Sequence, residues 1–595
     1  MVSKDFCLNT MTNPTGSSTH LMRAASLADL EAKGSLLIHL DGQTIALFCS
    51  DGRVYAIDNR CPHMGFPLHG SICKDGIVTC PWHYARFDLI SGGTFDSWAD
   101  DVRSFPIQIQ AGDIWLDLAP QVDVRSHQQQ RLQDGLEQDI SLVIAKSVMA
   151  LLDLHVSPTE PFQLGLAFGT RYSKTGWDMG LTILTALMNL LPYLDEGDRP
   201  RALYQGLSAI ARDSAAAPPH FLVHPLPTAA VEFAPLKTWF RQFIERRDAE
   251  AAERCLVTAV RSNLPRTQIA EMLFAAATDH RYLDGGHTLD FINKALEALD
   301  HVNWQHAEPV LASLIAGLAS ASRMEESNSW CYPVDLVMIL TAAFEQLPEA
   351  LAVGRSHQGS WNNRAELLPI LLGDDAAAIV EALLQALRTG STDVQLAAAV
   401  TYAAALRVAR FHTNNDHGDW HAAHHPFTFA NAVHQGLQRS PTIDLLRGVF
   451  DAAMRVYLNR FLNVPPARLA DPKDTVVDPA PLLQQLPTLL DRQQQVNETG
   501  KLVAQYLYSG GEPRRLMALL GKLMLRENRD FHVTQSMEAA FRLYATLGDT
   551  PEGVQVLTAT ARYLAAHAPT MRQQAQTYQM ACRLNRGDRL FEEID

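Results

Sequence analysis

Two short pairs of metal-ligand residues constrain this chain more than any other feature of its sequence. Cys61 and His63 are separated by one residue, Cys80 and His83 by two, and sixteen residues lie between the pairs. Two cysteines and two histidines at such spacings are typical of a metal site, because thiolate sulfur and imidazole nitrogen both bind zinc and iron. The sequence therefore predicts that residues 61–83 form two loops around a metal or a metal cluster.

The distribution of cysteine and histidine between the two pairs bears on which metal is bound. A structural zinc finger usually presents a cysteine pair followed by a histidine pair. Here each pair holds one cysteine and one histidine, so the two cysteines can bind one iron of a 2Fe-2S cluster and the two histidines the other. With Pro62, Pro81, Gly65 and Gly70 in the loops, the segment resembles a Rieske 2Fe-2S domain. A ribbon-like zinc site is the alternative.

The resemblance covers residues 20–120 and implies that the two cysteines and two histidines bind a Rieske cluster. Respiratory-type Rieske proteins resemble one another in a disulfide beside the cluster, but Phe66 and Trp82 stand at its two positions here. They also carry a serine that hydrogen-bonds a sulfide, where this chain has Ala85. Because fewer hydrogen bonds to sulfur leave the reduced cluster less stabilised, we expect a potential on the order of −150 mV, similar to that of the ferredoxin and oxygenase branches.

Turn signals around the ligand loops predict a small all-β domain. The stretch 35–57 reads as short apolar strands broken by Asp-Gly turns at residues 41–42 and 51–52. Asp-Gly between alternating apolar residues is a strong hairpin signal. A further hairpin is expected across 104–118, where apolar and polar residues alternate on both sides of residues 111–113.

The remaining four-fifths of the chain has a different composition. After a polar linker at 121–138, the sequence is rich in Ala, Leu and Gln with helical periodicity, and strand signals almost vanish. We therefore predict an α+β multidomain protein, with a small all-β Rieske domain followed by a large all-α region of repeated helix pairs. The all-α region is expected to divide into a helical repeat domain at 139–465 and a C-terminal region at 466–595 that continues the array.

A weak internal repeat indicates how these helices are organised. Two segments begin with Arg-Tyr and then reach Trp177 or His287 before a helix, and similar beginnings recur at His425 and, more faintly, at His532. Helix pairs repeated at about 105 to 140 residues suit a helical array or toroid. The repeated histidines either converge on one centre or are inherited packing residues.

A dense run of histidines predicts a second metal site. Residues 411–434 hold six of the 22 histidines of the chain. His417 and His421 are four residues apart, so on a helix they share a face with His425. We expect these three, together with His287, to bind a non-haem iron or a haem that accepts electrons from the cluster. The candidate carboxylates near this site are Asp416, Asp419, Glu325 and Glu326.

The position of His425 before a proline supports its role as a ligand. Pro426 suits the first position of a helix, which would leave His425 at the helix N-terminus. There the helix dipole favours the neutral imidazole, the form that binds metal. Histidines at helix starts also commonly cap or pack, and a loop rich in Asn, Asp and Gly is often only a turn.

Composition limits the partners and the compartment. The formal net charge of −15 argues against nucleic acid and anionic membranes, since both bind basic faces. No apolar run is expected to span a membrane, and the polar N-terminus lacks the pattern of a signal peptide, so we expect a cytoplasmic protein. The eight cysteines are scattered and suggest no disulfide framework.

Two functions from different classes fit these observations. The first is a Rieske iron-sulfur oxidoreductase whose cluster relays single electrons to a metal or oxygenase centre that acts on a small-molecule substrate. The second is an electron-transfer or redox-sensing adaptor whose helical array is a docking scaffold. No Gly-x-Gly-x-x-Gly segment opens a helix after a strand, so an external reductase or ferredoxin must supply the electrons. A homo-oligomer is compatible with either function.

Overall fold

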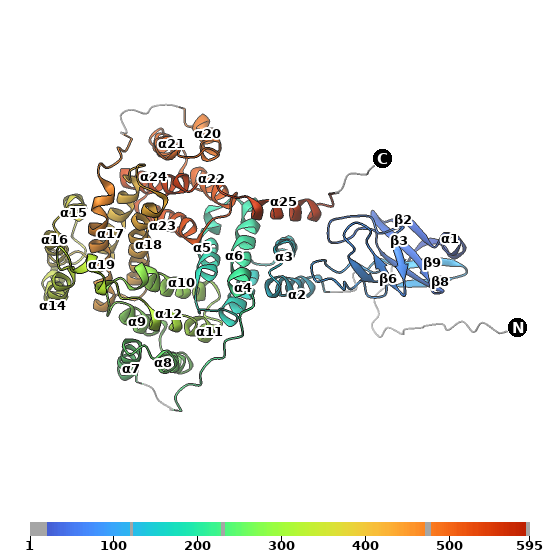
Figure 1. The fold of residues 1–595 in the computed structure, drawn as a ribbon, viewed down its shortest axis with the longest axis horizontal. Coiled ribbons are helices and arrows are strands. Elements are labelled where there is room, and N and C mark those ends of the chain that lie inside the picture. Colours follow the sequence, from blue (N-terminus) through green and yellow to red (C-terminus); the bar gives the residue numbers. More distant parts are fainter. Residues whose placement is uncertain (1–20, 120–122, 228–231, 471–477, 589, 591–595) are drawn as a thin grey trace. The chain divides into compact units, whose positions relative to one another are not determined.

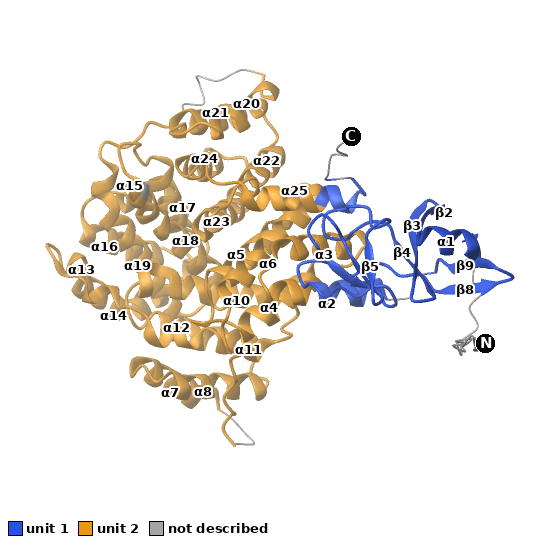
Figure 2. Cartoon of the chain, turned by 45° about the vertical axis from the view of Figure 1, so that its right-hand side comes forward, with its two compact units in different colours: residues 1–131, 582–595 blue, residues 132–581 orange. Residues whose placement is uncertain are grey.

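The chain forms two compact units. The computed structural model describes residues 21–119, 123–227, 232–470, 478–588 and 590. One unit comprises residues 1–131 with 582–595, and the other comprises residues 132–581 (Figure 1, Figure 2). All the described strands belong to the first unit. The predicted order, a small β domain followed by a large helical region, is confirmed.

The first unit is built from three small antiparallel sheets, in the orders β1-β9-β8, β2-β3-β4 and β5-β6-β7. A short helix, α1 (Leu27–Lys33), follows the first strand. The strands are β1 (Leu21–Ser26), β2 (Ser35–Leu40), β3 (Gln43–Ser50), β4 (Arg53–Asp58), β5 (Ile72–Lys74), β6 (Ile77–Thr79), β7 (Arg86–Asp88), β8 (Ile107–Gln110) and β9 (Asp113–Asp117).

The predicted hairpins are confirmed. Two-residue turns at 41–42, 51–52 and 111–112 join paired strands, and both residues of each turn have positive φ. Such turns match the right-handed twist of the strands they connect. Strand β3 is central, because its buried residues alternate between two cores. Ala46 and Phe48 face the core that contains both ligand cysteines.

The second unit is helical. Several helices start with a side-chain cap, such as Asp335, Asp375 and Asp530, each of which accepts a hydrogen bond from a backbone N–H of the first turn. The helices after the β strands are α2 (Val124–Glu137), α3 (Ser141–Asp153), α4 (Thr159–Arg171), α5 (Met179–Leu190), α6 (Arg199–Ser214), α7 (Phe233–Glu245), α8 (Ala249–Arg261), α9 (Arg266–Ala277), α10 (His287–His301), α11 (Ala307–Ala312), α12 (Ile315–Ser320), α13 (Asn328–Cys331), α14 (Leu336–Gly354), α15 (Arg364–Leu371), α16 (Ala376–Arg388), α17 (Asp393–Ala409), α18 (His417–Arg439), α19 (Ile443–Leu458), α20 (Ala480–Leu490), α21 (Val496–Tyr508), α22 (Pro513–Leu525), α23 (Phe531–Leu547), α24 (Pro551–Ala566) and α25 (Gln573–Asn585).

Four helices of this unit form a closed ring of contacts. Helix α5 packs against α10 and α23, and α18 also packs against α10 and α23. These are the helices that open the four copies of the predicted repeat, and the arrangement can be followed in Figure 1. Helices α6, α19 and α24 pack against α5, α18 and α23 as the second members of their pairs. In the remaining copy the second helix, expected over 308–321, is divided into α11 and α12.

Helix α18 continues through the proline that was expected to begin it. It starts at His417, capped by Asp416, and Pro426 lies in its interior, so His425 is not at a helix N-terminus. A proline has no N–H to donate to the carbonyl four residues earlier, here that of Ala422. The side-chain amide of Asn459 donates to this carbonyl instead. That partner removes much of the cost of an interior proline.

Part of the segment predicted as a polar linker is helical. Residues 124–137 of the predicted linker at 121–138 form α2, and residues 120–122 lie outside the described part of the chain. Arg131 on this helix is buried and donates to Asp100 Oδ1 at 2.9 Å and to the carbonyl of Ala99 at 2.9 Å. The polar residues of this segment therefore include Arg131, a buried cation that binds residues of the β unit. Composition alone does not distinguish such a residue from solvated polar side chains.

The expectation that no apolar run has the length of a membrane span is wrong for one segment. Residues Leu336–His357 are long and apolar enough to cross a membrane by length and composition, with a mean hydropathy of 1.5 over 18 residues. Within the described residues it is the single stretch that meets these criteria. In the structure α14 contacts α16 and α19, while Met338 and Val353 remain exposed.

Candidate metal centres

The two ligand loops of the β unit have the same backbone geometry. In the first loop, Cys61 N–H donates to the carbonyl of residue 66 and the carbonyl of Cys61 accepts from Gly65 N–H, at 2.7 and 2.8 Å. In the second, Cys80 N–H donates to the carbonyl of residue 85 and the carbonyl of Cys80 accepts from Tyr84 N–H, at 2.8 and 3.0 Å. Gly65 and Tyr84, each four residues after the cysteine, both have positive φ. The loops therefore present their cysteines and histidines in equivalent ways.

These loops bring the four predicted ligands together. Both cysteines are buried, and the rings of His63 and His83 lie 5.0 Å apart between centroids. The Cys61 thiol donates to Cys80 and, together with the backbone N–H groups of Trp82 and His83, lowers the pKa of Cys80 to about 6. Backbone N–H groups aimed at sulfur stabilise thiolates, the form that binds iron. The residues thus fit a 2Fe-2S cluster, with two cysteines on one side and two histidines on the other.

The surroundings of the ligands match the branch without a bridging disulfide. Phe66 and Trp82 pack their rings against each other, with centroids 5.8 Å apart, so an aromatic contact joins the two loops. Ala85 is fully buried and carries no hydroxyl. Trp98 packs edge-on against His63, with centroids 4.7 Å apart, whereas His83 is exposed. Of the two predicted histidine ligands, His83 therefore carries the imidazole that is accessible to a partner.

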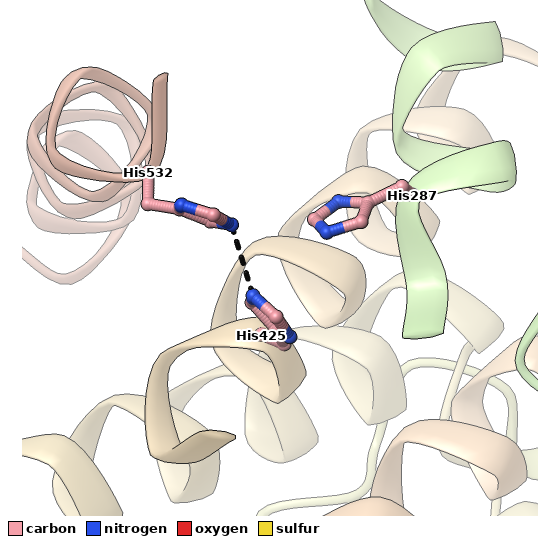
Figure 3. Close-up of side chains that lie close together, drawn as sticks. All are labelled: His287, His425 and His532. Atoms are coloured by element: carbon pink, nitrogen blue, oxygen red, sulfur yellow. Dashed lines mark hydrogen bonds between the residues drawn. The ribbon is translucent and has the colours of Figure 1, made fainter. Parts of the chain in front are cut away.

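A second group of histidines converges in the helical unit. His287 begins α10, His425 lies within α18 and His532 is the second residue of α23. Figure 3 shows their three rings directed toward one another from three separate helices. One ring nitrogen from each lies within 4.8 Å of the other two, and His425 Nε2 is 2.9 Å from His532 Nε2. Of the two alternatives for the repeated histidines, convergence on one centre or inherited packing, the proximity of their rings is what the first requires.

The spacing of one pair of these nitrogens fits a metal ion. Two imidazoles bound at about 2.0–2.1 Å place their nitrogens about 2.9–3.4 Å apart at octahedral to tetrahedral angles. The 2.9 Å between His425 and His532 falls at the short end of that range. Three histidines would leave one or more coordination positions open, the arrangement of catalytic rather than structural sites. The set suits iron, zinc or copper.

A second set of possible ligands shares His532. His421 on α18, Asp530 and His532 also place one ligand atom each within 4.8 Å of one another. His421 Nε2 and His532 Nδ1 lie 4.0 and 3.8 Å from the carboxylate of Asp530. A carboxylate beside the second nitrogen of a ligand histidine orients the ring and raises its basicity. On the other side of His421, its Nδ1 is 2.8 Å from the hydroxyl of Tyr563 on α24.

Burial favours the neutral form of His287 and His425. Together with the charges of neighbouring histidines, it lowers the pKa of His287 to about 4 and that of His425 to about 2. His424, fully buried and stacked on Tyr563, has a pKa well below its usual value for the same reasons. Although burial favours the protonated acid, the nearby imidazole of His532 and the hydrogen bond from the backbone N–H of Val533 hold the pKa of Asp530 below its usual value. The site thus offers neutral nitrogens beside one carboxylate, a donor set that attracts a cation.

The structure changes the predicted composition of this second site. Of the four predicted histidines, His421, His425 and His287 lie at the site, whereas the side chain of His417 lies outside the described part of the chain. The carboxylate beside them is Asp530, which had not been predicted. The first two candidate carboxylates, Asp416 and Asp419, form the capping box of α18.

The other two candidate carboxylates serve elsewhere. Glu325 accepts hydrogen bonds from His280 and from the backbone N–H of Arg281. Glu326 lies in the neighbouring 3-10 turn, Met324–Glu326. The repeat pattern was the signal that could find His532, whereas nothing in the sequence marked Asp530 or Tyr563, because the segments that carry them meet α18 only through tertiary packing.

The β unit and its ligand loops define a Rieske-type iron-sulfur protein. The family model of the Rieske [2Fe-2S] domain matches residues 20–106. The 3-phenylpropionate/cinnamic acid dioxygenase ferredoxin subunit of Escherichia coli is 35% identical over 97 residues, which are 16% of this chain and 91% of that protein. The ferredoxin component of the p-cumate 2,3-dioxygenase system of Pseudomonas putida is 30% identical over 112 residues, 17% of this chain and 95% of its own.

The chain belongs to the Rieske family through this N-terminal unit. Among solved structures, the ferredoxin of carbazole 1,9a-dioxygenase from Nocardioides aromaticivorans matches 16% of this chain and 95% of its own, at 24% identity and a TM-score of 0.16. Homology to ferredoxin components of dioxygenases implies that the β unit carries a 2Fe-2S cluster and transfers electrons. These relatives match the β unit alone, so they do not bear on the role of the helical unit.

Proposed function

We propose that this protein is a Rieske-dependent oxidoreductase in which the 2Fe-2S cluster supplies single electrons to a metal ion held in the helical unit. His287, His425 and His532 would hold the metal, with His421 and Asp530 beside them. When bound, a redox-active metal such as iron would supply electron acceptance and oxygen chemistry at a position left open by the three histidines. The residues of the chain supply neutral nitrogen donors and a largely dry environment.

The observation that carries this proposal is the meeting of three histidines from three helices. A buried histidine used only for packing satisfies its nitrogens with ordinary hydrogen-bond partners. Here the Nε2 atoms of His425 and His532 face each other at 2.9 Å, and the ring of His287 lies 4.8 Å from that of His425 between centroids. Two neutral imidazoles can share such a contact through one N–H···N hydrogen bond, and a metal ion would take the place of that proton with both nitrogens as ligands.

The partners of the protein follow from this assignment. The electron donor is an external reductase or ferredoxin, consistent with the ferredoxin-type match of the β unit. The substrate is a small molecule that reaches the histidine site. Neither the two-unit fold nor the histidine site requires nucleic acid, and the assembly of the chain into a homo-oligomer is open to measurement by light scattering.

Iron content tests the proposal directly. The full-length protein, purified after expression with iron, should contain more than two iron atoms per chain, since the cluster accounts for two. His425→Ala and His532→Ala should lower the content toward two while the electron-paramagnetic signal of the reduced Rieske cluster persists. His357→Ala, at an exposed turn, is the matched control and should retain the wild-type content.

The result also separates the two classes of function. If the wild-type protein holds only two iron atoms, and no other transition metal is detected by elemental analysis, the oxidoreductase proposal fails and an electron-transfer adaptor with a helical scaffold accounts for the chain. If a third metal is present, reoxidation of the pre-reduced cluster by oxygen should be slower in His425→Ala than in the wild type. Equal rates would show that the metal does not accept electrons from the cluster.

A further inference from the structure

Some buried cations in the helical unit are neutralised by carboxylates. Arg281 pairs with Asp451 at 3.1 Å, and Lys294 pairs with Glu297 and Glu538 at 2.9 and 2.6 Å. Burying an unpaired charge is costly, so such pairs are the usual arrangement. Other buried arginines of this unit can be compared with these pairs by whether they too have a carboxylate partner.

Arg562 on α24 departs from this arrangement. It is only 3% exposed, yet within the described residues no carboxylate oxygen lies within 4.0 Å of its guanidinium. Its Nη1 donates to Asn497 Oδ1 at 2.8 Å and its Nη2 to the carbonyl of Phe411 at 2.7 Å, while its buried Nε has no partner. Glu498, the one acidic residue that influences it, is exposed and forms no ion pair with it. Burial accordingly lowers the pKa of Arg562 to about 10.

The packing around Arg562 leaves space for its side chain to reach a cavity. The neighbouring residue on α21 is Gly500, where a Cβ atom would lie 2.8 Å from Arg562 Cγ. Only a residue without a side chain allows the arginine stem to pass at this point. The arginine then lines a cavity of about 770 Å³ enclosed by α21, α24 and the segment at 465–470.

The lining of this cavity is cationic and apolar. Three cations line it, Arg562, Lys501 and Arg468, and none of its described lining residues is acidic. The formal charge of the whole chain is −15, so a cavity without a carboxylate is unusual for this protein. Pro465 and Pro466 contribute an apolar wall. Cavities of about 300–1,000 Å³ accept small organic molecules.

A second basic cavity adjoins the first through Pro466, which lines both. The second cavity has a volume of about 500 Å³, and its lining contains three arginines and one acidic residue, Asp374. One of the arginines, Arg407, is 6% exposed. Within the described residues Arg407 also has no carboxylate partner, and its Nη2 donates only to backbone carbonyls. Two buried arginines without counter-ions, in neighbouring cavities, indicate a region that attracts negative charge.

We propose that the cavity lined by Arg562 and Lys501 binds a small organic anion, whose carboxylate or phosphate group pairs with these two side chains. The planar guanidinium group of an arginine can form paired hydrogen bonds with a carboxylate or a phosphate. The apolar wall favours an organic anion over a purely inorganic one. The remainder of the ligand would lie against Pro465 and Pro466. This site is separate from the histidine cluster and does not depend on a metal there.

Binding of two probes to the full-length protein tests the proposal. Sodium benzoate represents a carboxylate with an apolar body, and inorganic phosphate represents the phosphate group. Isothermal titration calorimetry would be performed to about 10 mM, at which a site with a Kd of about 1 mM is nearly saturated, with sodium chloride at matched ionic strength as the blank. Saturable binding of benzoate alone identifies a carboxylate ligand, and binding of phosphate alone identifies a phosphate ligand.

Variants connect the binding to the cavity. Arg562→Gln should weaken binding at least about tenfold, and Lys501→Gln should weaken it by about three- to tenfold, since each removes one charge-assisted pair. Arg515→Gln is the control, because Arg515 is 75% exposed and pairs with Glu512 on the surface, and it should bind as the wild type does. The iron content of all three variants should be unchanged.

Two results would overturn the proposal. One is the absence of saturable binding of either probe to the wild-type protein. The other is unchanged affinity in Lys501→Gln. Lys501 is exposed and therefore tolerant of substitution, so this variant can be tested even if Arg562→Gln does not fold. Neither result bears on the histidine site, which is judged by metal content.

Discussion

Mild acid should destabilise the helical unit through His434, which lies on α18 nine residues after His425. His434 is 1% exposed, and its Nε2 is 3.0 Å from the side-chain nitrogen of Gln438. An amide nitrogen can only donate, so Nε2 must accept and remain unprotonated in the folded state. Burial and, to a smaller extent, the charge of Arg542 lower the pKa of His434 to about 4.

The size of the effect follows from the difference between the two states. In the unfolded chain His434 takes up a proton near pH 6.5, whereas in the folded chain it does so near pH 4. The unfolded state therefore binds more protons between these values, and stability falls as the pH is lowered. At 1.36 kcal/mol per pKa unit, the loss is about 3 kcal/mol in full and about 2 kcal/mol between pH 7 and pH 5.

The assay compares the wild type with His434→Gln in metal-free protein. Urea unfolding followed by far-ultraviolet circular dichroism at pH 7, 6 and 5 gives the free energy of unfolding of the helical unit. The contributions of the other buried histidines cancel in the difference between the two proteins. Relative to the wild type, the variant should gain about 2 kcal/mol in free energy of unfolding between pH 7 and pH 5. A difference that does not change with pH would refute the reasoning, and His357→Gln, at an exposed site, should show no shift.

Three further predictions concern the cluster and the proline in α18. His63→Ala should abolish the electron-paramagnetic signal of the reduced Rieske cluster while Cys73→Ser preserves it, and circular dichroism should show unchanged helix content in both. Ala85→Ser should raise the potential by about 40 mV if its hydroxyl stabilises the reduced cluster by about 1 kcal/mol; a redox titration that finds no increase would count against the role given to this position. Asn459→Ala should lower the free energy of unfolding in urea by about 1–3 kcal/mol, because the carbonyl of Ala422 loses its donor. Unchanged stability would mean that another group satisfies that carbonyl.

The β unit could be predicted from the sequence because its determinants are local. The four cluster ligands lie in residues 61–83, and the loops that present them are closed by hydrogen bonds between residues at most five positions apart. The hairpins depend on two-residue turns whose conformation follows from Asp and Gly. Short-range geometry of this kind is the same in any fold that contains the segment.

The helical unit could be predicted only in outline. Periodicity and the repeat indicated helix pairs, and the repeat pointed to His287, His425 and His532. It did not indicate whether they meet, since His425 and His532 are 107 residues apart in the chain. The proline in α18 shows the same limit, because Asn459, the residue that satisfies the freed carbonyl, comes from beyond the next helix.

What the sequence by itself determined is therefore the Rieske family of the N-terminal unit with its four candidate ligands, the order of a β unit and a helical unit, and the set of histidines available for a second centre. Only the tertiary structure decided which of those histidines meet, that Asp530 is the carboxylate beside them, and that Arg562 is buried without a counter-ion. The physical reason is that turn preferences and ligand spacing act between near neighbours in the chain. Convergence of side chains and the pairing of buried charges depend instead on how the ring of α5, α10, α18 and α23 packs.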